Sequence, residues 1–133
     1  VKEVDRVKMK KPFRQGLLHR SGAAYQITAS ASVSGDSAWY DGHFPGYPLL
    51  PGIAILALVE EAILAAELDE GRAVRITSVG KVRFRLPVKP DEELTLKIFR
   101  QEGREGWIYL FTVNLAGASA CTGAFTARMV NDP

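Results

Sequence analysis

Residues 42–70 read GHFPGYPLLPGIAILALVEEAILAAELDE, and the organisation of the whole chain follows from this stretch. Pro51 suits a first helical turn and Gly71 is a natural helix end, so we predict one helix from Pro51 to about Glu70. Its first two turns, Ile53 to Val59, are apolar on every face. A helix of that kind is buried all round, so the rest of the chain must wrap it.

Strands are predicted on both sides of this helix. Apolar and polar residues alternate from Ala24 to Ser34, which is typical of a half-buried strand. Beyond the helix, short connections separate apolar segments, and Gly80 is expected to mark a bulge or bend. These segments predict strands at Val74–Val79, Val82–Leu86, Leu94–Gln101, Trp107–Ala116 and Ser119–Val130.

The order of these elements predicts an α+β fold, in which an antiparallel sheet packs on one long helix. The strand Trp107–Ala116 is apolar on both faces, so we expect it in the middle of the sheet. A length of 133 residues fits one domain, so we expect residues 1–133 to form a single unit.

Composition argues against several classes of protein. The 17 Lys and Arg against 15 Asp and Glu give a net charge of +2, which is too small to argue for nucleic acid binding. The single cysteine, Cys121, cannot form an internal disulfide or a Cys-based zinc site, and it favours a reducing, cytoplasmic setting.

No targeting segment or membrane span is expected. The most apolar run, Ile53 to Leu68, is short for a span and is interrupted by Glu60 and Glu61. We also find no phosphate-binding loop, metal-ligand cluster or serine triad in the sequence, and therefore expect neither a cofactor nor a metal.

His43 lies in a loop that prolines and glycines make rigid, just before the predicted helix start. Backbone N–H groups in a first helical turn lack intrahelical acceptors, and the helix dipole favours negative charge there. Gly52 has no side chain to block a ligand. A base candidate and an oxyanion donor thus meet at an apolar interior, which suits proton abstraction next to a carbonyl. The alternative for His43 is a packing or capping role.

Two segments carry a resemblance to a known family: GHFPGYPLLPG at 42–52 and KVRFRLPVKP at 81–90. Both are similar to segments of the 3-hydroxyacyl-(acyl carrier protein) dehydratases of the FabA/FabZ type, which have the hot-dog fold. The resemblance covers roughly Trp39 to Leu96. It implies an antiparallel sheet wrapped around one long central helix, with two protomers paired and the acyl chain in a tunnel at their interface.

The resemblance also implies roles for individual residues. His43 would remove the α-proton of a 3-hydroxyacyl thioester, and the Gly52 N–H would hold the thioester carbonyl. The acyl site would be lined by Phe44, Tyr47, Leu50 and Pro51, for which simple core packing is the alternative.

The chain departs from the family pattern at one position. The family's Glu or Asp, which protonates the departing hydroxyl from the partner's helix, lies five residues after the glycine, where this chain has Ala57. Glu61 lies one helical turn further along, in nearly the same direction, and Glu60 is the other candidate acid. The alternative for both glutamates is a polar helix edge that faces solvent or pairs with arginine.

Three hypotheses for function remain open. The first is a 3-hydroxyacyl-thioester dehydratase of lipid or polyene biosynthesis with altered acid chemistry. The second is a hot-dog acyl thioesterase that uses Gly52 and an acid such as Glu60 or Glu61. The third is a non-catalytic acyl-binding subunit whose missing acid comes from another chain.

The expected partners are an acyl carrier protein as substrate carrier and a second hot-dog chain, in a homodimer, a higher oligomer or a heterodimer. Arg83 and Arg85 alternate with apolar residues, so we expect them to face away from the apolar side of the strand. They are either a solvated sheet face or a contact for the acidic carrier protein and its phosphopantetheine.

Overall fold

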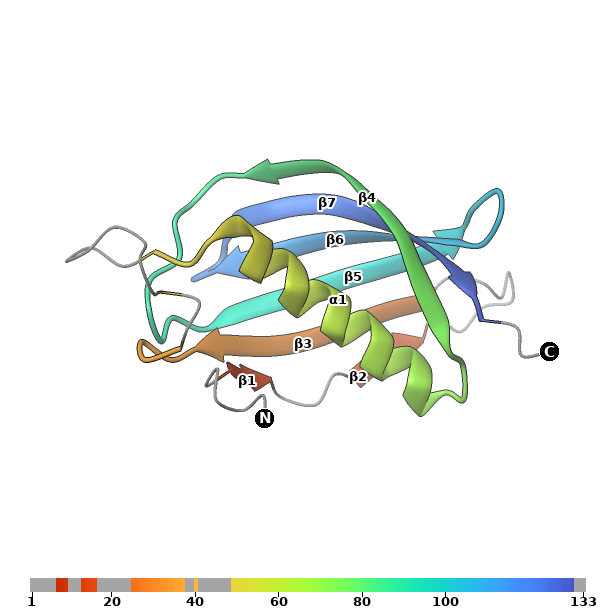
Figure 1. The fold of residues 1–133 in the computed structure, drawn as a ribbon, viewed down its shortest axis with the longest axis horizontal. Coiled ribbons are helices and arrows are strands. Elements are labelled where there is room, and N and C mark those ends of the chain that lie inside the picture. Colours follow the sequence, from red (N-terminus) through yellow and green to blue (C-terminus); the bar gives the residue numbers. More distant parts are fainter. Residues whose placement is uncertain (1–6, 10–12, 17–24, 38–39, 41–48, 131–133) are drawn as a thin grey trace.

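The computed structural model describes residues 7–9, 13–16, 25–37, 40 and 49–130 (Figure 1). In this part of the chain the elements are β1 Val7–Met9, β2 Phe13–Gly16, β3 Tyr25–Val33, α1 Gly52–Asp69, β4 Val74–Phe84, β5 Leu94–Glu102, β6 Trp107–Leu115 and β7 Ala118–Met129.

The strands form one antiparallel sheet in the order β1-β3-β5-β6-β7-β4, with β2 also paired to β3. α1 lies across one face of this curved sheet, and β4 arches over from the edge (Figure 1). The predicted α+β hot-dog fold is therefore confirmed, and so is the central position of β6 between β5 and β7. The sequence did not predict β1 and β2.

The core lies between α1 and the sheet. Every second residue of β3 from Ile27 to Val33 is buried, as the alternation predicted. The helix contributes its inward face to the same core, with buried residues Ala54, Ile55, Leu58, Val59, Ala62, Ile63, Ala66 and Glu67. The helix ends as predicted, because Gly71 adopts a positive φ of 79° and its N–H is bonded to the Leu68 carbonyl.

The expectation that the first two turns of α1 are buried all round is wrong for the single chain. One row of residues along the helix is exposed; we call it the outer stripe, and it consists of Ile53, Ala57, Glu61, Leu64 and Leu68. Ile53 is 65% exposed and Leu68 is 66% exposed. The sheet covers only one side of the helix, so the outer stripe has no cover among the residues that the structure describes.

β4 forms one edge of the sheet and runs from Val74 to Phe84, so it joins the two segments that were expected on either side of Gly80. The expected irregularity at Gly80 is confirmed, since the register with β7 shifts between Gly80 and Arg83. Lys81 adopts a left-handed φ of 55° at this bulge. Val79 and Phe84 are 42% and 52% exposed, so this edge strand presents apolar side chains at its surface. No helix in the described part of the chain is long and apolar enough to cross a membrane.

Candidate active site

The start of α1 offers backbone donors without a side-chain cap. Pro51 is the N-cap residue, and its carbonyl accepts bonds from the N–H groups of Ala54 at 3.0 Å and Ile55 at 3.4 Å. The N–H groups of Gly52 and Ile53 precede the first intrahelical bonds, so helix geometry gives them no acceptor. No acidic residue lies in the first turn. This helix end can therefore stabilise a carbonyl oxygen that gains negative charge.

The two sequence motifs meet at this helix start. The Leu50 N–H donates to the Val88 carbonyl at 2.8 Å, which joins the segment before α1 to the segment after β4. The Phe84 ring lies against Gly52, and a Cβ atom at position 52 would lie only 2.5 Å from the ring's Cζ. A glycine is thus required here for the close approach of ring and helix.

A cavity of about 450 Å³ opens at the same place. Its walls are residues 49–52 and 84–88 together with Ile55, so it includes the predicted Leu50, Pro51 and Gly52. Arg85 is the charged residue among the walls, and the others offer apolar side chains or backbone. An apolar cavity with a few polar groups at its mouth suits an acyl chain attached to a polar head.

Several predicted site residues fall outside the part of the chain that the structure describes. These are His43, Phe44 and Tyr47. The description resumes at Leu49, which itself lines the cavity. The role of His43 as a base therefore stays a prediction.

The candidate acids lie on the helix side away from this chain's core. Ala57 and Glu61 are both exposed members of the outer stripe, and Glu60 beside them is half-buried. Neither glutamate makes an ion pair or a hydrogen bond with another described residue. Neither acid is directed into the core that the described residues form, and Glu61 is accessible to a group from outside this chain.

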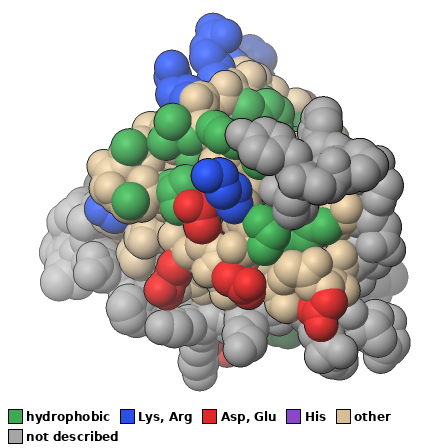
Figure 2. Space-filling view, turned by 90° about the vertical axis from the view of Figure 1, so that its left-hand side faces the viewer, with side chains coloured by type: hydrophobic (Ala, Val, Ile, Leu, Met, Phe, Trp, Pro, Cys, Tyr) green, Lys and Arg blue, Asp and Glu red, His purple; other side chains and the backbone are tan. Residues whose placement is uncertain are grey.

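Basic residues follow β4 toward the cavity. Residues 74–90 contain five cations and no Asp or Glu, and all five are exposed: Arg75, Lys81, Arg83, Arg85 and Lys89. Figure 2 views the molecule from the side where α1 begins, and Lys and Arg side chains gather along its upper edge while acidic side chains lie below. This end of the molecule therefore carries a separation of charge.

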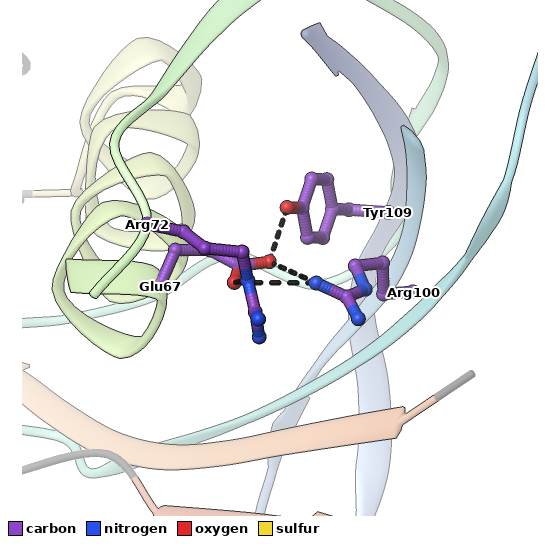
Figure 3. A network of polar contacts seen from close by, with 4 residues as sticks. All are labelled: Glu67, Arg72, Arg100 and Tyr109. Carbon is purple, nitrogen blue, oxygen red and sulfur yellow. Dashed lines mark hydrogen bonds and ion pairs between the residues drawn. The ribbon is translucent and has the colours of Figure 1, made fainter. Parts of the chain in front are cut away.

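A buried polar cluster lies at the opposite end of α1 (Figure 3). Glu67 has no exposed surface, and its carboxylate accepts bonds from Arg100 Nη1 at 2.9 and 3.2 Å. The Tyr109 hydroxyl donates to the same carboxylate at 2.5 Å, and Arg72 Nε donates to it at 2.9 Å. Arg100 also lies over the Trp107 ring, 3.8 Å from its centroid. We call these five residues the Glu67 network.

Sequence reasoning considered Glu60 and Glu61 and missed Glu67. A signal was present on β5, where Leu94, Leu96 and Ile98 face the core and Arg100 continues their alternation. An arginine on the buried side of a strand requires a buried anion, and that requirement points to a carboxylate on the helix.

Tyr40 lies directly before the segment that carries His43. It is buried, and its hydroxyl has no hydrogen-bond partner among the described residues. Burial, with Asp91 and Glu92 nearby, raises the pKa of Tyr40 to about 12, so its hydroxyl keeps its proton at neutral pH. Among residues that the structure describes, no group of His, Cys, Asp and Glu is arranged to hold a metal ion.

Comparison with known proteins matches residues 19–124 to the ApeI-like family, described as ApeI dehydratase. The chain is 33% identical over 114 residues to the 3-hydroxyacyl-[acyl-carrier-protein] dehydratase FabZ of Myxococcus xanthus, covering 80% of this chain and 74% of that protein. It is 36% identical over 87 residues to FabZ of Oceanobacillus iheyensis. That match covers 61% of this chain and 62% of the relative, so the chain spans less than two thirds of that protein's length.

Solved structures agree with the fold. The dehydratase heterocomplex ApeI:P from Xenorhabdus doucetiae is 25% identical, with a TM-score of 0.63 over 90% of this chain and 99% of that one. A putative thioesterase, yhdA from Lactococcus lactis, reaches a TM-score of 0.75 over 99% of this chain and 100% of the other. At 13% identity, the second likeness supports the fold alone.

Proposed function

Because this chain belongs to the ApeI-like dehydratase family, we propose that it removes water from a 3-hydroxyacyl thioester of an acyl carrier protein. The observation that carries the proposal is the meeting of the Gly52 helix start with residues 84–88 around one apolar cavity. The names of the FabZ relatives state this activity, and we take the acyl carrier protein as the substrate carrier from those names.

In the proposed reaction the Gly52 N–H holds the thioester carbonyl, where negative charge grows as the α-proton leaves. His43 accepts that proton. The electron pair of the broken C–H bond forms the α,β double bond while the bond to the β-hydroxyl breaks. An acid gives its proton to the departing hydroxyl, so the products are one water and a 2-enoyl thioester.

In this proposal the acid comes from a second chain. Ala57 has no proton to give, and Glu61 lies on the outer stripe, which a partner would cover. We assign this role first to Glu61 of a second copy, with Glu60 as the neighbour to test against it. The heterocomplex in the name of the Xenorhabdus protein favours the alternative of a different hot-dog partner that carries the acid.

The cations of β4 suit the carrier. Lys81, Arg83 and Arg85 are exposed along the strand that leads to the cavity, and Arg85 is one of its walls. An acidic carrier protein and the phosphate of its prosthetic arm would be attracted to this end of the molecule. The apolar cavity beside it would then receive the acyl chain.

Mass spectrometry of a 3-hydroxyacyl carrier protein incubated with the purified chain tests the proposal. We expect loss of one water, and an unchanged mass or loss of the whole acyl group would contradict it, the latter in favour of a thioesterase. His43→Gln should lower the rate about 10²- to 10⁴-fold, whereas His19→Gln, the matched control outside the motif, should not. Comparing Glu61→Gln with Glu60→Gln then identifies the acid.

A further inference from the structure

The contact between α1 and the sheet is almost entirely hydrocarbon. Glu67 is the polar exception on the buried face of the helix. It continues a row with four-residue spacing that begins at the cavity wall: Ile55, Val59, Ile63 and Glu67. Hydrophobic burial is non-directional, so apolar contacts alone specify the placement of such a face less sharply than directional bonds do.

The Glu67 carboxylate is directional, and it fixes several elements at one point. Its bonds to Arg100 and Tyr109 connect α1 to β5 and β6. Its bond to Arg72, together with the Glu67 carbonyl that accepts the Arg72 N–H at 2.9 Å, holds the turn that leads into β4. Figure 3 shows the side chains converging from the helix, the turn and the two strands.

The elements held in this way include the two that form the proposed site. α1 runs from the network to Gly52, and β4 runs from the same turn to Phe84. Gly52 and Phe84 meet again at the cavity, about 22 Å along the helix from Glu67 at 1.5 Å per residue. A rotation or shift of α1 at the network end therefore moves the Gly52 N–H relative to the β4 wall.

We propose that Glu67 is a positioning residue, whose network sets the axial and rotational placement of α1 and thereby the geometry of the site at the other helix end. Buried ionic groups are best attested in this role of fixing register, whereas their net contribution to stability against an apolar replacement is small or negative. The activity readout of this inference rests on the proposed function, but the placement of the helix does not.

The test replaces the network by apolar side chains of similar size, in the triple variant Glu67→Met, Arg100→Met and Tyr109→Phe. We expect a melting temperature within about 5 °C of the parent. In two-dimensional amide NMR spectra, we expect the signals of residues 52–69 to broaden or double. Dehydration should fall about 10²-fold, as expected for a misplacement of about 1 Å. The matched control removes the exposed pair Arg128 and Glu105, 3.5 Å apart, and should change none of these quantities.

One sharp set of helix signals with parental activity in the triple variant would overturn the proposal. Failure of that variant to fold would also overturn it, because the network would then supply stability rather than placement. Tyr109→Phe provides a milder check, since it removes one hydroxyl: shift changes that extend along α1 to Gly52 support the proposal, and changes confined to the network contradict it. If the parent dehydrates no substrate, the proposed function fails, yet the spectra still decide the role of Glu67.

Discussion

The two ends of α1 differ in how their polar groups are paired. At its start, the described polar groups are backbone N–H donors beside an apolar cavity, and no acid lies in the first turn to occupy them. At its end, the Glu67 carboxylate accepts hydrogen bonds from Arg72, Arg100 and Tyr109 within the chain. The first end thus suits the proposed binding of a thioester, and the second end pairs its charges internally.

Two glutamates six residues apart on this helix show the same contrast. Glu61 lies on the exposed outer stripe, and Glu67 lies on the buried face among cations. A carboxylate available to an outside group can serve chemistry, whereas one that accepts bonds from two arginines within the fold is held in place by their charges.

The largest effect is expected from breaking the enclosed end. Glu67→Gln keeps the side-chain size but removes the negative charge that the buried Arg100 guanidinium contacts, so the free energy of unfolding should fall by about 3–5 kcal/mol. Chemical denaturation followed by circular dichroism measures this loss. A decrease below about 1 kcal/mol would mean that water already screens the cluster.

At the open end, Gly52→Ala should affect activity more than stability. The new methyl group meets the Phe84 ring at 2.5 Å, but this ring is half exposed and can move outward. Alanine has a higher helix propensity than glycine, and this gain offsets the packing that the displaced Phe84 ring loses. The free energy of unfolding should therefore change by less than about 1 kcal/mol. Dehydration should fall about 10²-fold because the displaced ring and the methyl group disturb the site. Combining Gly52→Ala with Phe84→Leu removes the clash between the methyl group and the ring, so it separates the effect of the methyl group from that of the displaced ring.

Ala57→Glu tests whether the outer stripe is covered in the assembly. On an exposed helix surface this substitution should change the free energy of unfolding by less than about 0.5 kcal/mol. Under a partner, the new carboxyl is imperfectly paired and should cost about 1–3 kcal/mol. We expect the larger value, together with a cost that increases with protein concentration as measured by thermal melts across a dilution series. A small, concentration-independent change would indicate an uncovered stripe.

The smallest effect is expected at the surface pair of Glu105 and Arg128. Both side chains are more than half exposed and 3.5 Å apart, so solvent screens their attraction. Glu105→Gln should therefore change the melting temperature by no more than about 2 °C, measured by calorimetry. If Glu105→Gln lowered the melting temperature as much as Glu67→Gln does, burial would not explain the difference between the Glu105–Arg128 and Glu67–Arg100 ion pairs.

Local patterns predicted most of the fold. The alternation in β3, the proline before α1 and Gly71 after it placed those elements within a few residues, because each pattern reflects the backbone conformation of its own segment. β1 and β2 were missed because such short strands depend on pairing with β3 and carry little periodic signal of their own.

The site was predictable where a motif covered it and not where it depended on distant contacts. The motifs brought Gly52 and residues 84–88 to attention, and the structure places them together. The exposure of Ala57 and Ile53 was not foreseen, because an apolar sequence does not say whether its own chain or another one covers it. Glu67 and Arg100 are 33 residues apart, so their pairing becomes visible only once the helix lies on the sheet.

The bulge near Gly80 and Lys81 has a consequence for how the open edge of the sheet behaves. An uninterrupted edge strand is a template on which further chains can add without limit. In β4 the register shifts twice, between Ile76 and Ser78 and between Gly80 and Arg83, and the left-handed Lys81 lies at the second shift, so the edge is divided into short stretches. The charge of Lys81 at the bulge also disfavours pairing with further strands. The irregular edge thus resists the repeated strand addition that leads to fibres.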